Sequence, residues 1–169
     1  MQNEYESILI DLRNHGSSEH QVKMGYMDMA TDVIEFIAAN DLEPITILGH
    51  SMGGKVAMTV ALNYPDYVEK LIVVDIAPIR YKDNLTPTIT AMLNLDLSTI
   101  TSRSKAETLL APHVPDRAMR LFLLQNLHLK TGLASWSRNV AAIRDAMDEI
   151  IGPIPNLKNE KYLGPCTFI

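Results

Sequence analysis

The sequence predicts an α/β fold in which helices pack on a mostly parallel sheet and a helical segment interrupts the sheet order. Two observations support this prediction. In the first half of the chain, short apolar runs alternate with amphipathic stretches, as they do in successive βαβ units. From about residue 79 the apolar spacing becomes helical and prolines punctuate it. The 169 residues, 47% of them hydrophobic, are enough for one domain with a substantial core.

Three apolar runs without polar alternation predict buried parallel strands, at residues 7–10, 45–48 and 71–74. The stretches between them predict helices. The first, which begins near residue 26, has apolar side chains at helical spacing and stops at Asn40 and Asp41. The second runs over residues 52–63 and ends before Pro65.

The second half of the chain contains four helical patterns and no convincing strand before residue 157. These patterns cover residues 85–97, 102–111, 115–127 and 137–151. The closing sequence GPCTFI predicts the start of a fourth strand. The expected organisation is therefore core elements at residues 1–78, a helical cap at 79–157 and a return to the sheet at 158–169.

Composition narrows the classes of function. A net charge of −5 argues against an electrostatic nucleic-acid partner. The longest apolar runs are far too short to span a bilayer. Cys166 is the only cysteine, so no internal disulfide is possible and a reducing compartment is expected. The first residues contain neither a signal peptide nor an Arg-rich transit peptide, and we expect an intracellular protein, either cytoplasmic or mitochondrial.

A G-x-S-x-G motif joins the second predicted strand to the second predicted helix. It reads Gly49-His50-Ser51-Met52-Gly53. In this motif the serine occupies a sharp strand-to-helix turn, and we expect side chains at both glycine positions to collide with the turn. Ser51 Oγ would then stand clear of the sheet as a nucleophile. The Met52 N–H, at the start of the helix, would face a developing oxyanion.

No cofactor or metal is expected. The histidines and carboxylates lack the spacing of metal ligands, and the turn lacks the length and the lysine of a phosphate-binding loop. Lys55, on the first turn of the helix, is expected to face solvent. Arg13 is expected to pin its own loop or, as an alternative, to contact a substrate acid.

The blocks DLRNHGSSEH, ILGHSMGGKVAMTVALNYPDYVEKLIVVDIAP and FLLQNLHLK…WSRNV resemble the α/β-hydrolase superfamily. The resemblance covers almost the whole chain. It is strongest to the branch of bacterial YbfF-type esterases, mitochondrial abhydrolase-domain proteins and yeast ethanol acetyltransferases. It implies that Ser51 is the nucleophile and that Asp75, in VVDIAP, is the acid of a catalytic triad. His50 matches the variable position of the motif and is expected to pack beneath the turn.

The resemblance also implies parts that these residues do not supply. The family places its base histidine after the last strand, and none of the five histidines here matches that position. It also places three strands before the DLRNHG strand, the third of them beside the strand that precedes Ser51. Without that strand the sheet has a gap, or its two neighbours pair directly. The chain is therefore expected to be a fragment or a truncated product of a longer hydrolase.

Three functions remain open at the level of sequence. The first is a serine hydrolase that acts on small esters, thioesters or acyl-CoA through an acyl-enzyme on Ser51. The second is an alcohol acetyltransferase, in which ethanol intercepts the same acyl-enzyme formed from acetyl-CoA. The third is an inactive product that keeps the turn but lacks the base. The sequence predicts no oligomeric state.

Overall fold

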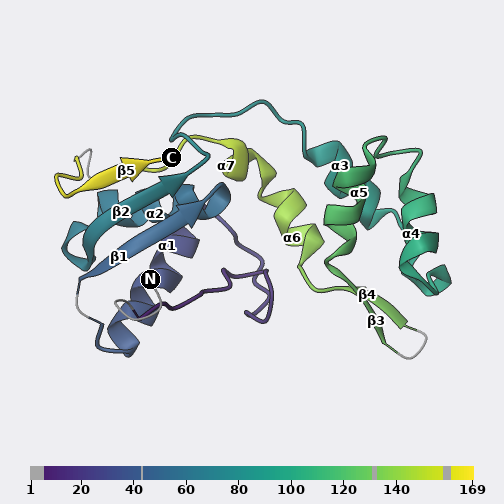
Figure 1. The fold of residues 1–169 in the computed structure, drawn as a ribbon, viewed down its shortest axis with the longest axis horizontal. Helices are drawn as coiled ribbons and strands as arrows, with labels where there is room; N and C mark the ends of the chain where they lie inside the picture. The colour runs from purple at the N-terminus through teal and green to yellow at the C-terminus, as the bar shows by residue number, and fades with distance from the viewer. Residues whose placement is uncertain (1–5, 43, 131–132, 158–160) are drawn as a thin grey trace.

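A computed structural model describes residues 6–42, 44–130, 133–157 and 161–169. Figure 1 shows a sheet with helices α1 and α2 behind it at one end of the molecule, and a mainly helical insertion at the other. The chain leaves the sheet through an extended segment after β2. It returns through α6 and α7, which lie between the two parts.

The helices are α1 (Tyr26–Ala39), α2 (Met52–Asn63), α3 (Thr86–Leu93), α4 (Arg103–Leu110), α5 (Arg117–Leu124), α6 (Val140–Asp145) and α7 (Met147–Ile151), with short 3₁₀ helices η1 (Pro65–Tyr67) and η2 (Leu97–Thr99). The strands are β1 (Ile45–His50), β2 (Val68–Val74), β3 (Leu127–Lys130), β4 (Leu133–Trp136) and β5 (Cys166–Phe168).

The main sheet is parallel, with strand order β1-β2-β5, which confirms the predicted fold class. Its register places His50 beside Val74 and Val73 beside Phe168. Because all three strands run in the same direction, their carboxyl ends meet at one edge of the sheet, where α/β proteins place their functional groups.

Helices α1 and α2 cover one face of this sheet. The core beneath them is formed by apolar residues that point inward from α1, α2 and β2, among them Met29, Ile37, Val60 and Val73, all fully buried. Burial of this apolar area is the main stabilisation of the half that carries Ser51.

The prediction that the strands are buried on both faces is wrong. Leu48 is 64% exposed, and along β1 its neighbours alternate between partly buried and exposed. Among the described residues, helices pack closely on one face only, so the opposite face of the sheet stays in contact with solvent.

Residues 7–10 do not form the predicted strand. They lie across a groove of about 290 Å³ from β1, and the groove is lined by Ile8, Leu9 and Ile10 on one side. A strand needs a neighbour that completes its ladder of hydrogen bonds, and the groove keeps this segment out of reach of β1. The gap, one of the two arrangements expected from the sequence, is therefore present.

The insertion also contains an element that was not expected. Strands β3 and β4 form an antiparallel hairpin, which pairs Leu127 with Trp136, so the prediction of no strand in this region is wrong. Each strand has only four residues, too few for a period of two to be recognised. The insertion has a core of its own, to which Leu110, Leu127 and Val140 belong.

Candidate active site

Ser51 occupies a strained turn between β1 and α2. Its backbone has φ 52° and ψ −123°, a conformation that non-glycine residues rarely adopt. The Ser51 N–H donates to the carbonyl of Val74 (3.1 Å), and the Ser51 carbonyl accepts from the N–H groups of Gly54 (2.9 Å) and Lys55 (3.2 Å). The turn is thereby held by β2 on one side and by α2 on the other, with Ser51 exposed.

The two glycines of the motif differ in how much space a side chain would have at each position. A Cβ on Gly49 would lie 2.2 Å from the carbonyl oxygen of Gly53, so a side chain is excluded there, as predicted. A Cβ on Gly53 would meet no atom within 4 Å outside its chain neighbours and the backbone of its own helix, so the predicted collision at this position is wrong. The second close approach belongs to Gly54, whose Cβ would lie 2.6 Å from Ile76.

Met52 is the first residue of α2, so its N–H belongs to the free amino end of the helix. None of the described backbone carbonyls accepts from it. The helix dipole adds partial positive charge at this point, next to Ser51. The geometry therefore suits Met52 for the predicted contact with an oxyanion.

Asp75 follows β2 at the same edge of the sheet, with φ 54°. Its N–H donates to the carbonyl of Ile169 (2.9 Å), which joins the turn to the end of β5. The carboxylate lies 3.9 Å from Nε2 of His50, and the two side chains are 88% and 64% exposed. The structure thus brings Ser51, His50 and Asp75 to one edge, and His50 lies open to solvent instead of packing beneath the turn.

No histidine in the described part of the chain is hydrogen-bonded to Ser51 Oγ. His20 is exposed, and His113 and His128 belong to the insertion. His15 lies in the turn after residues 7–10, where its Nδ1 approaches the carbonyl of Arg13 at 3.1 Å. Burial lowers the pKa of His15, and the nearby charge of Arg138 acts in the same direction.

Arg13 pins the turn that contains His15. Its guanidinium donates to both carboxylate oxygens of Asp32 (2.6 and 2.5 Å) and to the carbonyls of Lys23 and Asp28. The planar guanidinium thus binds the Asp32 carboxylate in a bidentate manner, and its other partners lie on α1 or in the segment just before it. Of the two expectations for Arg13, the structure supports the loop-pinning one.

Lys55 contradicts the prediction that it faces solvent: the residue is 1% exposed. Its Nζ donates to the carbonyls of Gly152 (2.5 Å) and Ile79 (2.9 Å). Burial lowers the pKa of this ammonium, with a smaller contribution from Arg80. The sequence did contain a signal, because Lys55 is the only charged residue of a helix that is apolar nearly all round.

The chain matches the α/β-hydrolase fold family over residues 2–155, and it belongs to that family. It is 37% identical over 168 residues to the sn-1-specific diacylglycerol lipase ABHD11 of Danio rerio, covering 96% of this chain and 52% of that protein. It is 31% identical to the esterase YbfF of Escherichia coli (strain K12), covering 89% and 58%.

A solved structure of a marine microorganism esterase superposes with a TM-score of 0.86 at 38% identity, covering 94% of this chain and 63% of that one. The recognised family and the fold class are thereby confirmed. The chain spans about half the length of the curated relatives it matches.

The described residues contain no group of three or more His, Cys, Asp or Glu side chains that could hold a metal ion. Within the same residues, no helix is both long and apolar enough to cross a membrane.

Proposed function

We propose that the protein is a serine hydrolase of small carboxylic esters or thioesters, with Ser51 as its nucleophile. The observation that carries the proposal is the strained, exposed turn at Ser51, which stands beside the free N–H of Met52 at the amino end of α2. Relatives named as a lipase and an esterase support the same reaction class.

In the proposed reaction, Ser51 Oγ attacks the carbonyl carbon of the substrate, and a histidine takes the hydroxyl proton. The Met52 N–H stabilises the oxyanion. The histidine then returns its proton to the leaving alcohol or thiol, which leaves an acyl-enzyme that water hydrolyses to the free acid. Asp75 orients the imidazole and stabilises its cation. Since the five histidines here make no bond to Ser51 Oγ, the proposal takes this base from outside residues 1–169.

Transfer to an alcohol is a second fate of the same acyl-enzyme. The chain is 26% identical to ethanol acetyltransferase 1 of Kluyveromyces marxianus, covering 95% of this chain and 51% of that protein. Product analysis with a short-chain acyl thioester in the presence of ethanol separates the two fates. Free acid as the main product supports a hydrolase, whereas ethyl ester supports a transferase.

A fluorophosphonate probe tests the nucleophile directly. The full-length protein should gain one phosphonyl adduct. Mass spectrometry of its peptides should locate this adduct on Ser51, and Ser51→Ala should abolish it. Asp75→Asn should keep the fold and lower ester turnover by roughly 10⁴-fold, as loss of the orienting acid does in other triads. An adduct on a different residue, or the absence of any adduct, would overturn the proposal and favour a non-catalytic protein.

A further inference from the structure

The ammonium of Lys55 is enclosed by groups from both ends of the insertion. Besides Gly152 and Ile79, the carbonyls of Ile150 and Ile151 lie 3.4 Å from Nζ. Ile79 lies where the chain leaves the sheet, and residues 150–152 lie where it returns along α7. We call these four carbonyls and the Lys55 ammonium the cage. A cation is favoured there because the carbonyls at the end of a helix carry partial negative charge.

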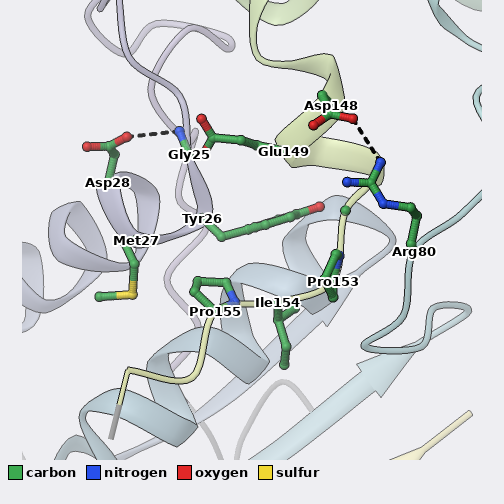
Figure 2. A pocket seen from close by; sticks show the side chains of 11 residues that line it. Gly25, Tyr26, Met27, Asp28, Arg80, Asp148, Glu149, Pro153, Ile154 and Pro155 are labelled. Carbon is green, nitrogen blue, oxygen red and sulfur yellow. Dashed lines mark hydrogen bonds and ion pairs between the residues drawn. The ribbon is translucent and has the colours of Figure 1, made fainter.

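Two aromatic rings also lie against the Lys55 ammonium, and we include them in the cage. The rings of Tyr81 and Tyr26 have their centroids 5.0 and 5.6 Å from Nζ, within the range of cation–π attraction. The Tyr26 hydroxyl donates to the carbonyl of Ile150 (2.6 Å), and the Tyr81 N–H donates to that of Ile151 (2.8 Å). The carboxylate of Asp148 is engaged by Arg80 instead (2.8 Å), as Figure 2 shows. The buried charge is thus balanced by dipoles and rings.

The backbone of the same residue belongs to the first turn of α2. The Lys55 N–H donates to the carbonyl of Ser51, so the backbone of Lys55 is bonded directly to that of the nucleophile, one helical turn away. Removal of the ammonium would take from the carbonyls of Gly152 and Ile79 the donor that the structure gives them, whereas those of Ile150 and Ile151 keep a second donor. The two ends of the insertion would then move relative to α2 to regain hydrogen bonds.

We propose that Lys55 is a positioning residue for Ser51: its ammonium clamps both ends of the insertion onto α2 and thereby fixes the turn that carries the nucleophile. The inference rests on the proposed function, in which the hydroxyl of Ser51 is the nucleophile. A displacement of about 1 Å at a reacting group can lower a rate by on the order of 100-fold. Lys55 acts through the backbone of α2 and touches no reacting atom.

Chemical rescue provides the test. Lys55→Ala deletes the three outer carbons and the nitrogen, which propylammonium replaces. Figure 2 shows an open pocket, of about 340 Å³, whose lining includes Tyr26. Gly152 also lines this pocket, so it adjoins the cage and gives a small amine a route toward it. We expect the variant to react with the fluorophosphonate at Ser51 roughly 10- to 100-fold more slowly, and propylammonium to restore most of the rate. The neutral 1-propanol should not restore it.

The matched control is Lys105→Ala, an exposed lysine of α4, which should react at the wild-type rate with or without amine. If the alanine variant does not fold, Lys55→Met keeps the apolar stem and should show the same slow reaction. The inference is wrong if either folded Lys55 variant reacts at the wild-type rate, or if 1-propanol rescues as well as the amine. It is also wrong if the amine raises the Tm of the variant without restoring the rate.

Failure of the proposed function is detected separately. In that case wild-type protein does not react at Ser51, and hydrogen exchange replaces the probe. The N–H groups of Gly54 and Lys55 bond to the carbonyl of Ser51 and report the first turn of α2 without any catalysis. Faster exchange of the Gly54 N–H in Lys55→Met, with slow exchange in Lys105→Ala, would support the clamp. Equal exchange in both variants would overturn it.

Discussion

At the scale of single residues, the turn around Ser51 depends on backbone proximity more than on the motif letters. Gly49 faces the carbonyl of Gly53 at a distance that no Cβ tolerates, whereas Gly53 faces open space. The two letters that define the motif therefore carry different physical requirements in this structure. A pair of alanine variants separates them.

Gly49→Ala should be destabilised by about 2–3 kcal/mol, with a fall in Tm of roughly 5–10 °C, because the new methyl group meets rigid backbone. Gly53→Ala should melt at the wild-type temperature or a few degrees above it, because alanine favours a helix over glycine by up to about 1 kcal/mol. Thermal unfolding followed by circular dichroism measures both. Equal losses in the two variants would contradict the assignment of the close contact to Gly49.

His15 should make the stability of the folded protein depend on pH. Burial places its folded-state pKa below its ordinary value of 6.5, so between the two values the unfolded chain binds more protons. Stability from neutral His15 is complete above pH 6.5 and is lost as the pH falls toward the folded pKa.

His15→Asn keeps a donor toward the carbonyl of Arg13 and cannot titrate. We therefore expect the urea midpoint of the wild type to fall relative to this variant as the pH is lowered from 8 to 5. His20→Asn, a change at an exposed histidine, should follow the wild type at every pH. Parallel curves for the wild type and His15→Asn would show that His15 does not contribute.

At the scale of elements, local sequence was informative wherever an element is defined by its own residues. The bounds of α2 were predicted to the residue, since the motif serine marks the turn before the helix and a tyrosine–proline pair ends the run. The errors share a different cause. The state of residues 7–10 depends on whether a neighbouring strand is present, and the burial of Lys55 depends on carbonyls 24 and 97 positions away.

The placement of the candidate site residues was predictable to the same extent. Ser51, Met52 and Asp75 follow strands, so a parallel sheet brings them to one edge. The cage around Lys55 was not predictable, because its acceptors are backbone groups, which carry no signature in the side-chain sequence.

The ion pair between Arg13 and Asp32 joins two elements, the turn before α1 and α1 itself. A double-mutant cycle with Arg13→Gln and Asp32→Asn should give a coupling of roughly 1 kcal/mol, a modest value because Asp32 is more than a third exposed. The matched cycle on Arg144 and Asp145, both exposed neighbours in sequence, should give a coupling near zero. Urea unfolding of the wild type, the four single variants and the two double variants measures both couplings. Equal couplings in the two cycles would contradict a specific pin.

At the scale of the whole molecule, large apolar side chains are exposed to solvent beside the sheet as well as on the insertion. Leu9 is 96% exposed and Leu48 is 64% exposed, beside the unpaired edge of β1. An edge strand with open N–H and C=O groups and apolar neighbours pairs readily with another chain. A polypeptide limited to residues 1–169 should therefore associate with itself through this edge.

Substitution by lysine tests this expectation. Leu9→Lys and Leu48→Lys each place a charge beside the β1 edge, and together they should shift the polypeptide of residues 1–169 toward monomer in sedimentation velocity at matched concentrations. Leu133→Lys provides the control, since Leu133 is 74% exposed but lies on the hairpin of the insertion. It should leave the distribution unchanged. If instead Leu133→Lys alone dissolves the associated species, the contact lies on the insertion and the β1 edge is not the associating surface.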